Sequence, residues 1–317
     1  MLIWDAHAGF ELRTVDDLAT LSIWKEAGVN FLSVNVGYDV IPWQRTVKAL
    51  SLARDWVRET EGYRLTGSAA EIDRAVADGQ MAVAFDIEGM NALDGTVDMV
   101  RFYYDLGVRQ MVFAYNLNNA AGGGCHDEDT GLTDFGRAVV AEMNAVGMLV
   151  DCSHCGYRTT MEAMECSRDP VIFSHSNARA LRDHERNIRD DQVVRCAETG
   201  GVVGVNGINQ FVGEDDISTS SIVDHIEYYL DLIGPGHVGI GLDYFHVTND
   251  GPGFEETLSG NDRYWPKSQY SGTKVRCAAP SQIHGIGEEL LRRNHPESVV
   301  EMVLGGNFRR VAGQVWK

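Results

Sequence analysis

The sequence lacks a surplus of positive charge and any long apolar run. Its 317 residues carry 46 acidic against 27 basic side chains, a formal net charge of −19 at pH 7. This charge repels phosphate backbones and anionic lipid surfaces, so we expect neither nucleic acid nor a membrane as a partner. The start, MLIWDAH, shows no basic segment followed by an apolar one, and no stretch approaches the roughly eighteen apolar residues of a membrane span. We therefore predict a soluble, cytoplasmic protein.

Cysteines and signals of a domain boundary are also scarce. Six cysteines in a chain of this length fit a reducing compartment, because a domain with a large core needs no disulfides. Cys152 and Cys155 frame the motif C-S-H-C, but no second pair with this spacing completes a structural zinc site, so we interpret both as small apolar residues near a strand end. No repeat, low-complexity tract or proline-rich linker divides the chain, which predicts a single domain over residues 1–317.

Short β-branched runs alternate with longer amphipathic stretches, a pattern typical of βα units around a parallel sheet. The predicted strands span residues 2–6, 30–36, 81–87, 109–114, 147–151, 171–174, 201–205 and 237–242. The predicted helices span residues 15–27, 45–60, 68–78, 96–106, 134–146, 157–168, 190–199 and 219–233, followed by C-terminal helices at 280–294, 296–304 and 306–315. Eight alternating units in one undivided chain favour an α/β fold of the (β/α)8 TIM-barrel type over an open sheet.

Local signals support these elements and mark one exception. Ser68 and Thr133 stand where helix N-caps are expected, and Gly147 stands where a helix should end. The stretch 244–279, rich in Gly, Asp, Ser and Tyr, reads as a long loop excursion. Loops of this length inside a compact domain usually have a function, so we expect a lid or a partner surface there.

Polar side chains follow the predicted strands. The residues just past the eight strands are His7, Asn35, Glu88, Tyr115, His154, His175, Asn206 and Asp243. In a barrel these positions converge on the rim where the strands end, which is where active sites lie. One histidine at such a rim is more often a packed residue, but three histidines with two carboxylates form a set of ordinary zinc ligands. A catalytic ion lowers the pKa of its bound water, so the set favours a metal-dependent hydrolase.

Several segments, in this order along the chain, resemble the renal, or membrane, dipeptidase family of metallopeptidases (family M19), which is amidohydrolase-like. They are DIEG (86–89), GLTDFGRAVVAEMNAVG (131–147), VDCSH (150–154), PVIFSHSNARAL (170–181), HERNIRDD (184–191), GIGLDY (239–244) and ELLRRNHPESVVEMVLGGNFRRV (289–311). The resemblance covers nearly the whole chain. It implies a (β/α)8 barrel, a binuclear zinc site bridged by a glutamate, and zinc-dependent cleavage of a dipeptide-like small molecule. Family members are often dimers, which leaves a homodimer open.

The resemblance assigns roles to five residues. Glu88 resembles the bridging ligand, while His154 and His175 resemble the two imidazoles of one ion. Arg186 resembles the arginine that binds the substrate carboxylate, a task suited to a planar guanidinium. Asp243 resembles the acid/base that handles the leaving amine. Read without the resemblance, Arg186 is a cation at the start of a surface helix, and Asp243 is a loop carboxylate that caps the next segment.

Three positions depart from the family pattern. The family begins with a His-x-Asp pair that binds the other ion; here His7 is followed by Gly9, so the carboxylate is missing and a second zinc is expected to be weak or absent. Tyr115 stands in place of a histidine that contacts the substrate carbonyl oxygen, and its hydroxyl, acidic only near pH ~10, can still donate a hydrogen bond. Phe245 replaces the second aspartate of an Asp-x-Asp-Gly motif, and His246 after it is more often a solvated rim residue than a substitute ligand.

These features leave three functions open. The first is a dipeptidase-like hydrolase with one firmly held zinc, since Glu88, His154 and His175 already make a three-ligand open site. The second is a family member that has lost hydrolysis and binds a small amino-acid-like ligand. The third is hydrolysis of an N-acyl or N-methyl amino acid. We favour the first, because Asp243 and Arg186 are retained and a pocket without chemistry has little need of them.

Aromatic residues mark expected substrate contacts. Trp43 is the best placed to cover a substrate, whereas Trp4 and Trp24 are expected in the core. Replacing Trp43 by alanine should therefore raise KM. In the excursion at 244–279, Tyr244, Tyr264, Trp265 and Tyr270 are expected to form a specificity element, a dimer contact or a packed mini-core.

Overall fold

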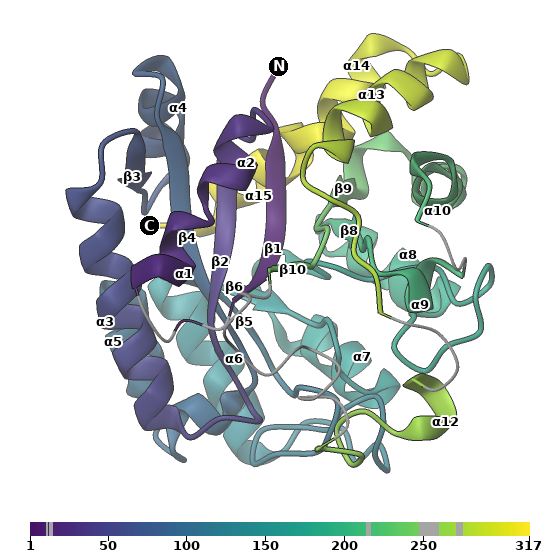
Figure 1. Cartoon of the computed structure of the whole chain (residues 1–317). Helices are drawn as coiled ribbons and strands as arrows, with labels where there is room; N and C mark the ends of the chain where they lie inside the picture. Colours follow the sequence, from purple (N-terminus) through teal and green to yellow (C-terminus); the bar gives the residue numbers. More distant parts are fainter. Residues whose placement is uncertain (11, 13–14, 214–216, 247–259, 271–274) are drawn as a thin grey trace.

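Parallel strands arranged around a common axis form the centre of the molecule, and helices surround them (Figure 1). The computed structural model describes residues 1–10, 12, 15–213, 217–246, 260–270 and 275–317. The strands that form the barrel are β1 (Trp4–Phe10), β2 (Phe31–Tyr38), β4 (Met81–Glu88), β5 (Val108–Val112), β6 (Leu149–Asp151), β7 (Val171–Ile172), β8 (Val203–Val205), β9 (Val238–Ile240) and β10 (Tyr244–His246). A short additional strand, β3 (Tyr63–Leu65), pairs with the beginning of β4.

The strand order makes this a (β/α)8 barrel of the TIM type. Hydrogen-bonded neighbours follow one another from β1 through β2, β4, β5 and β6 to β7, all parallel. A parallel bridge between Phe173 and Val203 connects β7 to β8, which pairs with β9. The chain then continues into β10, which pairs in parallel with β1 and so closes the barrel between its last and first strands. The predicted fold class is confirmed.

Helices cover the outside of this barrel. They are α1 (Val15–Ala19), α2 (Ser22–Glu26), α3 (Trp43–Glu59), α4 (Ala69–Ala77), α5 (Met99–Asp105), α6 (Asp134–Val146), α7 (Tyr157–Cys166), α8 (Asp190–Glu198), α9 (Asn209–Val212), α10 (Thr219–Ile233), α12 (Lys267–Tyr270), α13 (Gln282–Arg292), α14 (Glu297–Glu301) and α15 (Asn307–Val315). Short 3-10 turns occupy Met90–Leu93 and Pro235–His237, and a π-helical turn occupies Met302–Gly306. The buried faces of the longer helices, among them α3, α6 and α10, contribute to the main core cluster, as the amphipathic pattern predicts. Within the described residues, no helix is both long and apolar enough to cross a membrane.

All eight predicted strands occur, but the predicted end of the first was wrong. β1 continues to Phe10, so His7 lies within the strand rather than just past it. The extension exists because Ala8 and Gly9 pair with Tyr244 and Phe245 of β10, a partner strand that the sequence pattern did not reveal. The predicted helix at 15–27 is two short helices, and β3 and α9 were missed because each is only three or four residues long.

The buried side chains agree with most expectations for the core. Trp4 stacks on Phe31 of β2, with ring centroids 3.6 Å apart, and Trp24 is fully buried in a separate core cluster, where its ring meets Phe10. Cys152 and Cys155 are buried in the main core cluster, as expected for small apolar residues. Part of the excursion at 244–279 lies outside the described residues, and its described part contains β10 and α12. That residues 1–317 form a single domain stays a prediction.

The N-cap of α6 gives a test of the fold that is independent of function. The Thr133 hydroxyl accepts a hydrogen bond of 3.0 Å from the backbone N–H of Gly136, and α6 ends at Gly147 in the left-handed conformation. Removing an N-cap side chain costs typically about 1 kcal/mol. We expect Thr133→Ala to lower the free energy of unfolding by about 1 kcal/mol in denaturant titrations. Metal content should be unchanged, and a loss of bound metal would show that α6 supports the site more closely than its position suggests.

Candidate functional site

The ends of six strands bring together the residues singled out in the sequence. His7 lies in β1, Glu88 ends β4, His154 follows β6 and His175 follows β7. Asp243 stands between β9 and β10, and Tyr115 follows β5. All these strands are parallel, so their carboxyl ends meet at one rim of the barrel. The structure thus places these residues at the rim where a barrel forms its active site.

Glu88, His154 and His175 form the tightest cluster at this rim. The Oε1 atom of Glu88 lies 3.1 Å from Nε2 of His154 and 3.3 Å from Nε2 of His175. The two Nε2 atoms lie 3.0 Å from each other. Tetrahedral zinc with bonds of about 2.0–2.1 Å has ligand atoms about 3.3 Å apart, so three ligand atoms with these separations fit one ion.

The tautomer of His154 leaves a nitrogen lone pair directed into this cluster. Nδ1 of His154 lies 2.6 Å from the side-chain oxygen of Asn116, whose amide nitrogen donates to the carbonyl of Tyr264. That oxygen can only accept, so Nδ1 carries the proton and Nε2 presents a lone pair. This lone pair faces Glu88 Oε1, which is buried and has no hydrogen-bond partner. A divalent cation placed between these two atoms would bind both of them.

Burial keeps both histidines in the form that binds metal. It lowers the pKa of His154 and of His175 well below the ordinary value for histidine, with nearby positive charges adding to the effect. Burial also raises the pKa of Glu88 to about 8, because the charged carboxylate is removed from water. A bound cation would offset the cost of that negative charge. Neutral imidazoles and a buried carboxylate therefore fit a divalent ion electrostatically as well as geometrically.

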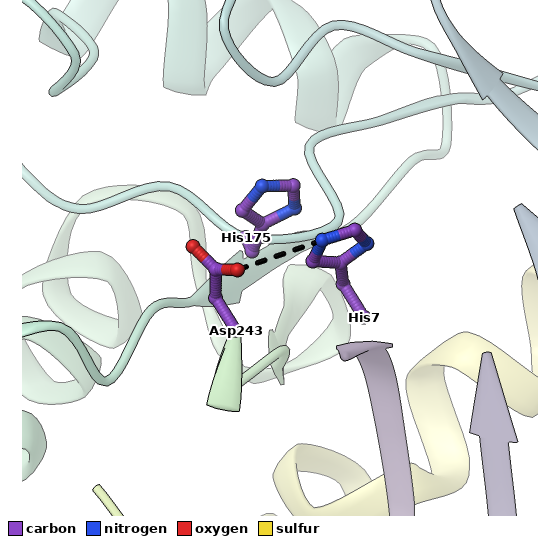
Figure 2. Close-up of side chains that lie close together, drawn as sticks. All are labelled: His7, His175 and Asp243. Carbon is purple, nitrogen blue, oxygen red and sulfur yellow. Dashed lines mark ion pairs between the residues drawn. The ribbon is translucent and has the colours of Figure 1, made fainter. Parts of the chain in front are cut away.

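His7 and Asp243 form a second group next to the first. Figure 2 shows the carboxylate of Asp243 pointing towards the imidazole of His7, with His175 beside both, and the Oδ1 and Nε2 atoms lie 3.5 Å apart. Proximity alone would allow His7, His175 and Asp243 to share an ion. However, the rings of His7 and His175 are stacked, with centroids 4.0 Å apart and planes 10° apart. An imidazole lone pair lies in its ring plane, so one ion cannot lie in both of these parallel planes.

The charge around His7 differs from that around the other two histidines. Its Nδ1 donates to Oδ1 of Asp86 at 3.1 Å, and its Nε2 lies 3.6 Å from Glu88. Burial acts to lower the pKa of His7, but the three surrounding carboxylates outweigh it and hold that pKa well above its ordinary value. Burial raises the pKa of Asp243, whose Oδ2 accepts a hydrogen bond of 2.9 Å from Asn206.

Backbone strain occurs at the same place. His154 and Asp243 have φ angles of 64° and 55°, in the left-handed region that residues other than glycine rarely adopt. Asn116, which holds His154, has a φ of 62°. Such conformations cost of order 1–3 kcal/mol each and persist where the surroundings enforce them, commonly at active sites.

A cavity opens above these residues. It contains about 730 Å³ of empty space, part of it at the open mouth, which is within the size range of small-molecule sites. Its polar floor includes His7, Glu88, His154 and Asp243. Its walls are mostly apolar and aromatic, formed by Phe10, Tyr38, Tyr115, Ile208, Phe211, Phe245, Trp265, Tyr270 and Val275. No lysine or arginine lines it in the part of the chain that the structure describes.

Comparison with known proteins identifies the family. Residues 25–259 match the family described as membrane dipeptidase (peptidase family M19). The chain belongs to the membrane dipeptidase family. An uncharacterized dipeptidase of Schizosaccharomyces pombe is 37% identical over 188 residues, which are 56% of this chain and 45% of that protein. The dipeptidase aclJ of Aspergillus oryzae is 31% identical over 243 residues, 75% of this chain and 52% of that protein.

A solved structure resembles this member of the membrane dipeptidase family over almost its full length. It is an amidohydrolase from Pseudomonas aeruginosa, with a TM-score of 0.90, 27% identity, and coverage of 99% of this chain and 96% of that one. By contrast, the chain spans about half the length of the curated relatives described above. The predicted family membership is confirmed.

Two residues with predicted substrate contacts lie away from this cavity. Arg186 is 2% exposed and donates to the carbonyl oxygen of His175 and the hydroxyl of Ser176, at 2.7 and 3.0 Å. It borders a second cavity that shares His154 as a wall, while its Nε atom has no partner. Trp43 begins α3 and is not among the described residues that line the main cavity. Their roles in binding substrate stay predictions.

Tyr115 lines the cavity as a neutral hydrogen-bond donor. Its ring stacks on His154, with centroids 4.3 Å apart, and meets Tyr38 and Trp265 edge-on. Burial raises the pKa of its hydroxyl well above the ordinary value, so the proton stays on the oxygen near neutral pH. Tyr115 therefore offers a neutral donor at the cavity wall, and its role in contacting substrate stays a prediction.

Sequence reasoning missed the residues that orient the ligands. Asp86 accepts from His7, Ser33 and Asn35, and Asn116 orients His154, as described above. Asn35 also donates to Oε2 of Glu88 at 3.3 Å. Asp86 stands two residues before Glu88, so the alternation of side chains along a strand could have placed it beside Glu88 on the inward face. Asn116 directly follows Tyr115.

Trp265 is one of the aromatic residues that line the cavity. It is 4% exposed and its ring centroid lies 6.0 Å from that of Tyr115. Losing most of an aromatic contact costs about 1.5–3 kcal/mol, so we expect Trp265→Ala to raise KM roughly tenfold or more with a smaller change in kcat. Steady-state kinetics of Trp265→Ala and Trp43→Ala should be compared. A rise in KM for Trp43→Ala alone would restore the sequence-based assignment and contradict the cavity lining.

Proposed function

We propose that the chain is a zinc-dependent, dipeptidase-like hydrolase that cleaves the amide bond of a small dipeptide or amino-acid derivative. One firmly held ion would be bound by Glu88, His154 and His175. The observation that carries the proposal is the lone pair of His154 facing the unpartnered Oε1 of Glu88 at 3.1 Å. The names of the curated relatives, both dipeptidases, support the choice of substrate class.

The geometry supports one ion more strongly than two. Glu88 directs Oε1 to the histidines, while its Oε2 accepts a hydrogen bond from Asn35. On the other side the Nε2 atom of His7 lies near Asp243 and that same Oε1, and the two distances, 3.5 and 3.6 Å, are longer than those in the first cluster. Gly9 offers no side-chain ligand there. Two donors and a shared oxygen make a weak second site.

The residues around the cavity each have a defined task in the proposed amide hydrolysis. When bound, the ion supplies a water of lowered pKa and polarises the substrate carbonyl. The Asp243 carboxylate would accept a proton from the attacking water and deliver it to the nitrogen of the leaving amine. The Tyr115 hydroxyl donates a hydrogen bond to the oxygen on which negative charge develops. The apolar walls exclude bulk water, which strengthens both interactions.

The walls of the cavity favour one refinement of the substrate class. Apolar and aromatic side chains surround a floor that carries two carboxylates, and no lysine or arginine lines the cavity in the described residues. A substrate with apolar substituents suits these walls, and an acyl group in place of a free amine removes a charge that they cannot solvate. Hydrolysis of N-acyl amino acids is therefore the second candidate, on the same residues and by the same steps.

The proposal is tested by assaying amide cleavage on a matched panel. Protein loaded with zinc and desalted is given dipeptides of L-L and L-D configuration, and N-acyl and N-methyl forms of the same amino acids. Released amino acid is measured by chromatography. We expect cleavage of at least one class, its loss after chelation, and its return with zinc. If one ion is bound and no member of the panel is cleaved, the chain is instead a binding protein that has lost hydrolysis.

A further inference from the structure

Gly9 and Phe245 are in contact across the two strands that close the barrel. They are register partners in β1 and β10, and both line the main cavity. A Cβ atom placed on Gly9 would lie 2.7 Å from Cδ2 of the Phe245 ring and 3.6 Å from two further ring atoms. Separations under 3.0 Å do not occur for real Cβ atoms without a shift of the neighbour. The ring therefore occupies the space that any side chain at position 9 needs.

The backbone does not explain the glycine. Gly9 is not among the glycines with positive φ, so any residue could adopt its conformation. Residues two apart on a strand point to the same face, so a side chain at position 9 would stand beside His7 at the floor of the cavity. The Asp243 carboxylate already lies 3.5 Å from Nε2 of His7. A carboxylate at position 9 would give this side of the site three ligands of its own.

We propose that Gly9 and Phe245 are a matched pair that keeps the His7 side of the site from holding a divalent cation. The inference rests on the proposed single-ion site. The aromatic ring occupies the space that a side chain at position 9 would need, so it bars a ligand there. Neither substitution alone should then restore the second site, because Gly9→Asp leaves the ring in place and Phe245→Ala leaves the carboxylate missing. The two together should restore it.

A simpler explanation is that the contact between Gly9 and the Phe245 ring only stabilises the packing of the two strands. An aromatic side chain laid over a strand glycine shields the backbone and stabilises the strand pair. On that account Phe245→Ala lowers stability, but ion content does not depend on the residue at position 245. The two accounts differ in the number of ions that the double variant binds.

The test is a four-member cycle of wild type, Gly9→Asp, Phe245→Ala and the double variant. Each is loaded with excess zinc, desalted, and analysed for zinc per chain by elemental analysis. We expect one ion in the wild type and in each single variant, and two in the double variant. Two ions in Gly9→Asp, or one in the double variant, would overturn the proposal. Two ions in the wild type would overturn it as well, whereas absence of hydrolysis with one ion bound would overturn only the proposed function.

A metal-free readout covers the case in which Gly9→Asp does not fold. Gly9→Ala adds only the Cβ atom that meets the Phe245 ring. We expect this variant to lower Tm in the wild-type background and to leave Tm unchanged in the Phe245→Ala background. An equal fall in both backgrounds would show that the ring does not limit position 9.

Discussion

Replacing His175 by alanine is expected to abolish ion binding and hydrolysis together. His175 is fully buried, its Nε2 lies 3.3 Å from Glu88 Oε1, and burial keeps its imidazole neutral. Loss of a residue that merely orients a ligand costs about 10- to 100-fold in metal affinity or activity, so loss of a ligand should cost more than about 100-fold. Ion content after desalting and hydrolysis by the same preparation are the measurements.

His175 is the better histidine to replace, and an exposed histidine serves as its control. His154 is a less suitable target, because its φ of 64° means that an alanine there also changes the backbone. His284 is exposed on α13 and serves as the matched control, since His284→Ala removes an imidazole without touching the rim. Thermal unfolding of both variants separates loss of the ion from loss of the fold. Full hydrolysis by a folded His175→Ala would end the proposed mechanism.

Replacing Asp243 by asparagine is expected to separate catalysis from ion binding. The carboxylate stands between His7 and Asn206, outside the cluster of Glu88 and its two histidines. Loss of a general acid/base lowers kcat about 10²- to 10⁴-fold. Asparagine is chosen because it tolerates the left-handed backbone of this position, where φ is 55°. We therefore expect one ion per chain, as in the wild type, with kcat reduced over that range.

The control for this variant is Asp105→Asn, an exposed carboxylate at the end of α5. It changes the net charge by the same amount and should leave kcat unaltered. If Asp243→Asn instead loses its ion, Asp243 is a ligand, and the single-ion site must include it. If Asp243→Asn keeps full kcat, the proton transfer assigned to Asp243 belongs to another group.

The sequence predicts the barrel because its signal is repeated. Eight β-branched runs alternate with amphipathic helices, and α6 and α10 begin and end at the predicted residues, 134–146 and 219–233. Short elements escaped prediction, because β3, β10 and α9 have only three or four residues and no periodicity to detect. β10 matters most among them, because its pairing with β1 moves His7 inside a strand and sets Phe245 against Gly9.

The site is predictable only in part for a similar reason. Strand ends and the family resemblance bring Glu88, His154 and His175 together, and the structure places their ligand atoms within 3.3 Å of one another. The sequence cannot show that Nδ1 of His154 donates to Asn116, because that contact joins residues 38 positions apart. It also cannot show that Arg186 borders a second cavity, because the direction of a long side chain depends on packing around it.

The most direct measurement is zinc per chain by elemental analysis, in the wild type and in His7→Ala, after loading with excess zinc and desalting. If Glu88, His154 and His175 hold the ion, both proteins retain one zinc, because His7 lies outside that cluster and stacks on His175 without sharing its ion. No zinc in a folded wild type, or loss of the ion in His7→Ala, would contradict this assignment of the metal site.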